Sequence, residues 1–555
     1  MKRWKILAAL LICLLSLCAC EKKSAEKAPE KTQIEGDADA STTPFGRYKK
    51  TVTYTLGKMT GLNHSNMPEG DTYENNAYTR YLKKKINIQN EDVFEASESD
   101  NFSEAVSVAI ASKNLPDVMV INDMDTLQML VKNDMIADLT EAYERCASTR
   151  IKEIYQSYGD TILDNVTFDG KLMALPETNI ENGPSLLWLR KDWMDKLGLK
   201  EPKTLEEAEH VIQMFVEKDP GDNGKGKTIG LACDDELTGG CDFSYEYQTD
   251  IIFANYGVYP KHWYEKDGKV VYGSVQPQAK QALKRIRKMY ENGMLDQDFL
   301  LRGTDNVIDA VTSGKCGSFF GPWWAPNNPL MAAMQKDPDA IWMPYLIETD
   351  KDGSTSFVTQ SPSTKWVVVR KGYAHPEIVM KIVSVLFGET KFGDADTTEL
   401  TKYYQENVDP TARPLAINVD YYDALFRCYD DLKAALTGKK AVSDLEIVEG
   451  SYFESCYRYQ RTRSTSSWED WAAYTSRITA CRILKEGKVK TVQGLHFSNT
   501  ATMKTKWWNL KKLEKQVYLE IVTGQKPLSY FDDFVKQWNR QGGKKITQEV
   551  VEKVK

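Results

Sequence analysis

The chain has 555 residues, of which 41% are hydrophobic and 27% are charged, so it is long enough to bury large globular cores. Its formal net charge of −7 comes from well-mixed acidic and basic residues, which excludes a nucleic-acid-binding protein that relies on a concentrated basic face. Beyond the N-terminus, charge interrupts every apolar stretch, so we expect a soluble body that lies outside the membrane.

The first twenty residues resemble an export signal that ends in a lipid attachment site. A basic start, KRWK, precedes the apolar run 6–17, which is too short for a permanent membrane helix. The Leu-Cys-Ala-Cys that follows resembles the bacterial lipobox, which implies that Cys20 becomes the mature N-terminus and carries a diacylglycerol with acyl chains such as palmitate. An ordinary cleaved signal peptide is the alternative. Loss of residues 1–19, which include three basic and no acidic residues, leaves a net charge of about −10.

The next segment predicts a tether followed by alternating strands and helices. Residues 20–47 are rich in Lys, Glu, Ala and Thr and bury too little apolar surface to order themselves, so we expect a disordered tether. The alternating TVTYTLG from Thr51 predicts a strand. Helices are predicted at 78–85 and 102–112, then a buried strand in LPDVMVIND and a helix in LQMLVKN. This alternation predicts an α/β fold with mixed, mostly parallel sheets flanked by helices.

The middle and the end of the chain continue this pattern. Thr204 and Glu207 form a capping-box pair ahead of a helix with one apolar face. A second amphipathic helix is predicted at 278–292, a strand at 365–370 and a helix at 377–387. The C-terminal third is predicted to be largely helical.

Apart from Cys13, Cys18 and Cys20, seven cysteines remain: Cys146, Cys233, Cys241, Cys316, Cys428, Cys456 and Cys481. An odd number leaves at least one unpaired, and we expect most of them to be small buried hydrophobes. The sequence has no CxxC pair, no HExxH, no GxSxG and only singly scattered histidines, so we predict no catalytic residues, no metal and no cofactor.

One loop matches a nucleotide-binding motif by its letters alone. GDNGKGKT at residues 221–228 fits the P-loop formula, which requires a strand before it and a helix after it. Here a predicted helix precedes the loop and the strand-like TIGLAC follows, so no helix N-terminus faces a phosphate. We therefore reject a nucleotide site at this loop.

Five phrases together resemble the family 1 extracellular solute-binding proteins of ABC importers, in particular the large, maltose-binding-protein-like lipoproteins that bind oligosaccharides. These phrases are LPDVMVIND…LVKNDMIADLT, DGKLMALPETN, LLWLRKDWMDKLGLKEPKTLEE, GKCGSFFGPWWAP and FDDFVKQWNRQGG, and the similarity begins at about residue 48.

The resemblance implies a two-lobe periplasmic-binding-protein-like (type II) fold, with ligand held in the cleft between the lobes. The expected first lobe comprises residues 48–172 with 346–400, and the second comprises 173–345 with 401–555. The chain is then expected to cross between the lobes near residues 171–176, 344–348 and 400.

Aromatic residues are the main candidates for ligand contacts, because flat rings complement the apolar faces of sugar rings. Trp323 and Trp324 lie between two prolines on a predicted loop, and in maltose-binding relatives the tryptophan of the matching GPW stacks on a sugar. Trp323 is therefore the first candidate, and the others are Trp324, Trp263, Tyr256, Trp188 and Trp366. Trp188 and Trp366 also fit buried strands. Asp123 either hydrogen-bonds sugar hydroxyls or caps the next helix.

The loop at residues 219–228 also resembles the calcium loop of this family. Asp219 and Asn223 match its pattern, whereas Gly221 and Lys227 stand where the family has acids, and Asp222 is the one acid able to substitute. Because affinity for calcium follows the number of charged ligands, we predict no bound metal, although the sequence leaves calcium open.

These features predict a lipid-anchored solute-binding component of an ABC transporter on the extracytoplasmic face of the cell membrane. It is expected to be a monomer that captures an oligosaccharide and delivers it to the permease subunits. Two alternatives stay open: a receptor of the same fold for a peptide or another small solute, and a surface-anchored glycoside hydrolase.

Overall fold

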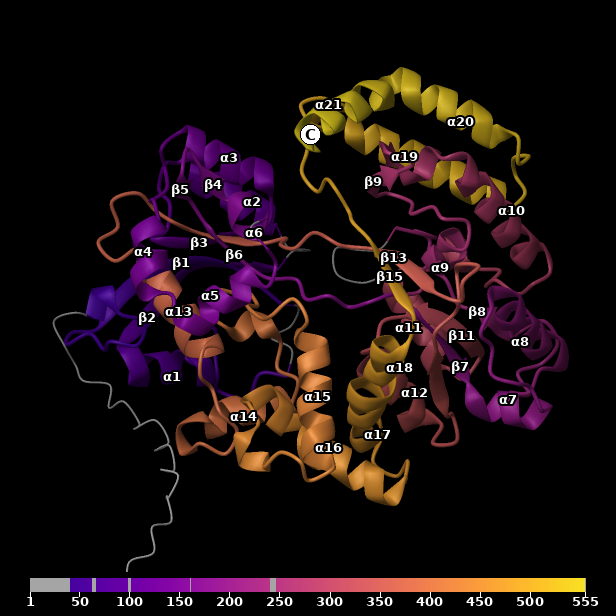
Figure 1. The fold of residues 1–555 in the computed structure, drawn as a ribbon, viewed down its shortest axis with the longest axis horizontal. Helices are drawn as coiled ribbons and strands as arrows, with labels where there is room; N and C mark the ends of the chain where they lie inside the picture. Colours follow the sequence, from indigo (N-terminus) through magenta and orange to yellow (C-terminus); the bar gives the residue numbers. More distant parts are fainter. Residues whose placement is uncertain (1–39, 62–65, 98–100, 160, 240–245, 555) are drawn as a thin grey trace, which may run out of the picture.

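Two lobes lie side by side in the computed structural model, joined by extended segments that pass between them (Figure 1). The structure describes residues 40–61, 66–97, 101–159, 161–239 and 246–554. The predicted lipid site at Cys20, most of the tether, and Cys241 lie outside these residues. Within them, no helix combines the length and the apolar character that a membrane span requires.

The first lobe is built on a five-stranded sheet of order β2-β1-β3-β14-β6. Its strands are β1 (Val52–Thr60), β2 (Ile88–Ser97), β3 (Val118–Ile121), β14 (Trp366–Val369) and β6 (Leu175–Pro176). β1 runs parallel to β2 and β3, whereas β14 is antiparallel to both β3 and β6. Every residue of β3 and β14 is buried, as expected for central strands that are covered on both faces.

Helices surround this first sheet. They are α1 (Ala77–Ile86), α2 (Phe102–Ala111), α3 (Met124–Lys132), α4 (Thr140–Cys146), α5 (Thr149–Gln156), α6 (Thr161–Asp164), α13 (Ile378–Phe387) and α14 (Thr398–Gln405). A small hairpin, β4 (Thr167–Phe168) with β5 (Lys171–Leu172), lies beside them.

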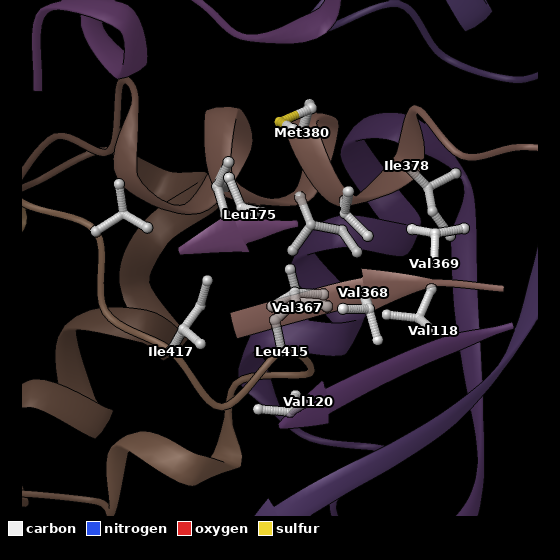
Figure 2. Packing of buried hydrophobic residues seen from close by; sticks show 14 of the residues in the cluster. Val118, Val120, Leu175, Val367, Val368, Val369, Ile378, Met380, Leu415 and Ile417 are labelled. Carbon is white, nitrogen blue, oxygen red and sulfur yellow. The ribbon is translucent and has the colours of Figure 1, made fainter. Parts of the chain in front are cut away.

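The core of the first lobe centres on the three strands nearest the lobe connection. Figure 2 shows Val120 of β3, Val367 of β14 and Leu175 of β6 packed together with Met380 of α13, and all four side chains are fully buried. Removing such aliphatic surface from water stabilises the fold by about 25 cal/mol per Å². This packing makes β14 and β6 firm supports for the segments that lead to the other lobe.

The second lobe is built on a four-stranded sheet of order β12-β7-β11-β8. Its strands are β7 (Leu186–Arg190), β8 (Ile229–Leu231), β11 (Cys316–Gly321) and β12 (Trp342–Tyr345). Two smaller sheets add β9 (Trp263–Lys266) with β10 (Lys269–Tyr272) and β13 (Thr355–Val358) with β15 (Val489–Val492). The helices that pack with them are α7 (Lys191–Leu197), α8 (Leu205–Lys218), α9 (Asp250–Ala254), α10 (Pro277–Glu291), α11 (Thr304–Thr312) and α12 (Met331–Lys336).

The chain after residue 423 is mostly helical, as predicted. Its helices pack mainly with the second lobe, and the helix at residues 447–462 also packs on α14 of the first lobe. α15 (Ala424–Leu436), α16 (Ile447–Thr462), α17 (Trp468–Tyr474) and α18 (Cys481–Glu486) form one group. α19 (Met503–Val522), α20 (Tyr530–Trp538) and α21 (Lys544–Val554), yellow in Figure 1, form a layer that packs on α10.

The α/β class is confirmed, but the prediction of mostly parallel sheets is wrong for the second lobe. There, β7 is antiparallel to both β11 and β12, and only β8 and β11 are parallel. β8 and β11 are joined through helices, which is the connection that parallel pairing requires. β7 instead enters directly from the other lobe, and β14 enters the first lobe in the same way, so no helical crossover imposes a parallel direction.

Three segments connect the lobes: residues 177–185, 359–365 and 418–423. They lie side by side, because the backbone N–H of Thr178 donates to the carbonyl of Asn418 and that of Asn179 donates to the carbonyl of Pro362, both at 2.9 Å. This arrangement forms a three-stranded hinge between the lobes.

All three crossings fall later in the chain than the sequence analysis expected. Leu175 pairs with Val367 in the first sheet, which keeps residues 171–176 in the first lobe. Residues 346–358 stay with the second lobe, because Thr355 pairs with Val489. Ile417 is buried in the first core, so the last crossing lies beyond 400.

The folded part also begins earlier than expected. Ala40 is only 3% exposed. The ammonium of the buried Lys381 donates to the carbonyls of Thr43 and Gly46 at 2.6 and 2.9 Å. Residues 40–47, predicted as tether, are therefore packed on the first lobe by hydrogen bonds to their backbone, which composition does not reveal.

The predicted local elements agree with the structure. Thr204 and Glu207 form the expected capping box at the start of α8, and the helix predicted at 278–292 is α10. The six described cysteines are all buried and free, which confirms their prediction as small hydrophobes.

Candidate functional site: the interlobe cleft

A cavity of about 590 Å³ lies between the lobes at the hinge, within the range of about 300–1,000 Å³ typical of small-molecule sites. All three crossing segments contribute to its wall. The first lobe adds residues from α3 and from the turn after α5, and the second lobe adds residues 493–498 and the end of α21. Because both lobes and the hinge line the cavity, a bound molecule would contact every part that moves when the lobes close.

Aromatic rings from both lobes face this cleft. Its lining includes Tyr158, Phe357, Trp366, Tyr422 and Phe497. Tyr158 and Tyr422 meet edge to face, with ring centroids 5.5 Å apart and planes at 88°. The Tyr158 hydroxyl donates to the carbonyl of Asp420 at 3.1 Å, which fixes the ring against the third crossing segment. These rings supply flat apolar surface in an otherwise polar wall.

Amide and hydroxyl side chains make up most of the polar lining. The members are Gln128, Ser157, Thr161, Asn165, Asn179, Asn182, Ser185, Thr359, Gln360, Ser361, Ser363, Gln493 and Ser498. Several are held in place by the hinge: the Asn179 amide donates to the carbonyl of Ser361 at 3.0 Å, and the Ser157 hydroxyl accepts from the N–H of Tyr422 at 2.9 Å. Neutral groups of this kind both donate and accept hydrogen bonds.

Glu181 is a carboxylate in the cleft wall, on the first crossing segment. It accepts a hydrogen bond from the backbone N–H of Gly183 at 3.0 Å and another from the hydroxyl of Tyr422. Burial raises the pKa of Glu181 above its usual range, while these two hydrogen bonds oppose the rise. Burial also raises the pKa of Tyr422, so its hydroxyl stays protonated and acts as a donor.

His496 also lines the cleft, in the segment after β15. Its Nε2 atom is buried and has no hydrogen-bond partner among the described residues. Burial lowers the pKa of His496 to about 4, so the ring is neutral near pH 7. A buried ring nitrogen without a partner is a position that a hydroxyl of a ligand can satisfy.

Comparison with known proteins identifies the family. The model of the bacterial extracellular solute-binding proteins matches residues 64–390, which is more than half of the chain. The chain belongs to this family.

Relatives of this solute-binding protein agree with that assignment. It is 28% identical over 222 residues to a Bacillus subtilis protein named polygalacturonan/rhamnogalacturonan-binding protein YtcQ, with 39% of this chain and 41% of the relative covered. It is 25% identical over 264 residues to lipoprotein LipO of the same species, with 47% and 49% covered. The matches thus span about half the length of these relatives or less.

Solved structures show the same fold over nearly the whole length. The substrate-binding protein FusA of S. pneumoniae, solved in complex with kestose, superposes with a TM-score of 0.61 at 16% identity, covering 91% of this chain and 99% of that one. The predicted two-lobe solute-binding fold is thereby confirmed.

Of the predicted ligand residues, the structure brings only Trp366 into the lining of the cleft. It begins β14, is 7% exposed and lies where the second crossing segment joins the first sheet. Asp123 is exposed and caps α3, because its carboxylate accepts from the N–H and the hydroxyl of Thr126 at 2.7 and 2.8 Å. Its neighbour Met124 lines the cleft instead.

The tryptophans around β11 lie beneath the cleft in the second core. Trp323 is 5% exposed, with the guanidinium of Arg477 4.5 Å from its ring centre. Its indole N–H donates to Oδ1 of Asn182 at 3.0 Å, and Asn182 does line the cleft. Trp188 is fully buried and donates to the carbonyl of Pro322 at 3.1 Å, and the half-buried Trp324 packs against the same core.

The remaining two candidates belong to a separate hydrophobic cluster of the second lobe. Trp263 is 3% exposed and packs against Tyr272, with ring centroids 4.9 Å apart. Tyr256 packs on the same cluster. The ligand roles assigned to these buried rings stay predictions, and the structure offers Trp323 only an indirect one, through Asn182.

Sequence reasoning missed most of the residues that line the cleft. Tyr158, Tyr422 and His496 lie in loops next to helices or a short strand, where no local pattern separates a ligand contact from a surface residue. A usable signal existed in the polar runs TNIENGPS and TQSPSTK, which separate pairs of buried strands. Both runs are crossing segments.

The loop at residues 219–228 does not fit a calcium ion. The carboxylate of Asp219 already accepts from the N–H groups of Asn223 and Gly224 at 3.0 and 2.8 Å and from the Thr228 hydroxyl at 2.5 Å. These hydrogen bonds, that from Thr228 first, lower the pKa of Asp219. The ammonium of Lys196 lies 3.3 Å from the Asp222 carboxylate. Among the described residues, no group of three or more His, Cys, Asp or Glu is arranged to hold a metal.

The P-loop match at the same loop has the wrong surroundings. α8 ends at Lys218 just before it, and β8 begins at Ile229 just after it. This helix-then-strand order is the reverse of the order that places a helix N-terminus against a phosphate.

Proposed function

We propose that this protein is the ligand-capturing component of an ABC importer and that it binds an oligosaccharide in the interlobe cleft. The observation that carries the proposal is the cleft wall, in which aromatic rings such as Tyr158 and Trp366 alternate with amides and hydroxyls. Rings complement the C–H faces of a sugar, and amides and hydroxyls complement its hydroxyl groups. Family membership supports a binding role without catalysis.

The hinge supports delivery of the ligand by lobe closure. Three hydrogen-bonded crossing segments allow the lobes to rotate about one line while each core stays intact. We propose that the closed, loaded protein docks as a monomer on permease subunits in the membrane.

Anchoring by lipid at Cys20 is a further part of the proposal, supported by the lipobox-like sequence. If Cys20→Ser leaves the protein as firmly membrane-associated as the wild type in cell fractionation, this part is wrong.

The proposal is tested by a thermal-shift panel with purified protein. Oligosaccharides of several linkages, oligopeptides and amino acids are added separately, and any that binds the folded state raises the melting temperature. We expect one class of oligosaccharide to raise it and to be recovered intact by chromatography. Stabilisation by a peptide instead would support the same-fold peptide receptor, and shortened sugar products would support a glycoside hydrolase.

A further inference from the structure

The charge in the cleft wall is sparse and unfavourable to anions. Among the described residues that line the cleft, the ionisable acids and bases are Glu181, His496 and Lys553, and none is an arginine. His496 is neutral near pH 7 because burial lowers its pKa to about 4. The described part of the wall therefore presents one carboxylate and one ammonium.

The ammonium lies at the rim. Lys553 is exposed near the end of α21, and its Nζ donates to the carbonyl of Asn499 at 3.1 Å. An exposed lysine already bound to a backbone carbonyl interacts weakly with an anion, because water screens it. It offers no counterpart to the bidentate arginine contacts that hold carboxylates in buried sites.

The carboxylate lies deeper, at the hinge. Glu181 is held in place by Gly183 and Tyr422, and the neighbouring lining residues are the amides Asn179 and Asn182. A second carboxylate brought into this cleft would lose its hydration without gaining a cation and would be repelled by Glu181. The hydroxyls of a neutral sugar would instead donate to Glu181 and exchange hydrogen bonds with the amides.

We propose that the cleft selects neutral oligosaccharides and rejects those built from uronic acids, with Glu181 as a specificity-determining residue. This inference rests on the proposed function of oligosaccharide capture and adds the class of sugar. Discrimination arises because Glu181 favours hydroxyl donors and opposes a carboxylate at the same position.

The test compares sugars that differ only in one group. Isothermal titration calorimetry is run on the wild-type protein with galacto- and gluco-oligosaccharides and with oligogalacturonates and oligoglucuronates of the same linkage and length, alongside neutral fructo- and xylo-oligosaccharides. We expect a neutral series to bind and the uronates to bind at least about a hundredfold more weakly, as expected for an unpaired charge in a partly buried site. A uronate that binds as tightly as its neutral counterpart overturns this inference and leaves the proposed function intact. No binding by any oligosaccharide overturns both.

A matched pair of variants tests the role of Glu181. Glu181→Gln removes the negative charge from the cleft, whereas Glu153→Gln removes it from an exposed carboxylate on α5, outside the cleft lining, that accepts from the Tyr421 hydroxyl at 3.2 Å. We expect Glu181→Gln to narrow the preference for neutral sugars by about tenfold and Glu153→Gln to leave it unchanged. An equal preference in wild type and Glu181→Gln would show that Glu181 does not set specificity. If Glu181→Gln does not fold, the Lys553→Gln variant is measured instead. A large loss of uronate binding in Lys553→Gln would mean that the rim lysine recruits acidic sugars, which contradicts the proposed preference for neutral ones.

Discussion

Asp125 of the first lobe forms an ion pair with Lys504 of the second, with the carboxylate Oδ1 and the ammonium Nζ 2.8 Å apart. The amide of Asn499 also donates to Oδ2 of Asp125 at 3.4 Å. The neighbouring residues Met124 and Ser498 line the cleft, so these contacts bridge the lobes directly beside it. They join the two lobes at a place outside the crossing segments, which gives the closed arrangement an electrostatic contribution.

The first prediction is that Asp125→Asn weakens ligand binding by favouring the open form. A partly exposed ion pair contributes about 0.2–1 kcal/mol, so affinity should fall roughly 1.4- to 5-fold, and the dependence of affinity on salt should decrease. Calorimetric titration at low and high salt measures both effects. Glu291→Gln is the control, because it breaks the Arg287–Glu291 pair (2.7 Å) within α10 alone. Equal losses in the two variants would contradict a bridging role.

The second prediction concerns Trp323, which is buried beside Arg477 and Asn182. Trp323→Ala should lower the free energy of unfolding by about 3–5 kcal/mol, because it leaves a cavity in the second core. Trp508→Ala, at a ring that is 68% exposed, should change it by less than about 0.5 kcal/mol. Denaturant unfolding measures both. A Trp323→Ala protein with wild-type stability and impaired binding would contradict the core role and show that the Trp323 ring contacts the ligand directly.

Trp323 also shows where prediction from sequence stops. Its loop, bounded by Pro322 and Pro326, suggested an exposed ring, but the loop folds inward because helices from more than a hundred residues later cover it. Those helices, α17 and α18, have no detectable relation to the loop in the sequence. Local elements such as the α8 capping box were predictable because neighbouring residues determine them.

The crossings and the cleft were harder to predict for the same reason. The hinge depends on pairing of 177–181 with segments near 362 and 418, and such distant pairing leaves no local pattern. Trp366 was one of the aromatic candidates, whereas Tyr422 and His496 enter the cleft lining only because segments far apart in the sequence meet there.

The third prediction is that this protein does not depend on calcium. The carboxylate of Asp219 already accepts three hydrogen bonds within the loop at residues 219–228. The ammonium of Lys196 lies beside Asp222 and donates to the carbonyl of Pro220 at 2.7 Å. Addition of a chelator should shift the melting temperature by less than about 2 °C, the change that roughly 1 kcal/mol produces in a large domain. A larger drop that calcium reverses would show that the loop rearranges to bind the ion.

The fourth prediction concerns pH. The pKa of His496 is lowered from 6.5 to about 4 in the folded state, so the unfolded chain binds more protons between these values. The stability that depends on the neutral ring is complete above about pH 6.5 and is lost as pH falls toward 4. His496→Gln should therefore lose less stability than the wild type over this range. His210→Gln, at an exposed position on α8, should follow the wild-type curve. Parallel curves for all three proteins would contradict the pKa shift.

The most direct test of oligosaccharide capture in the cleft is hydrogen–deuterium exchange, measured with and without the neutral oligosaccharide that raises the melting temperature most. Binding between the lobes should slow backbone exchange in residues 179–185, 359–363 and 493–498, which line the cavity from the hinge and from both lobes. Exchange in the outer loop at residues 221–227, which is not part of the lining, should stay unchanged. Protection confined to surfaces outside the cleft, with these three segments unaffected at saturating ligand, would contradict the account.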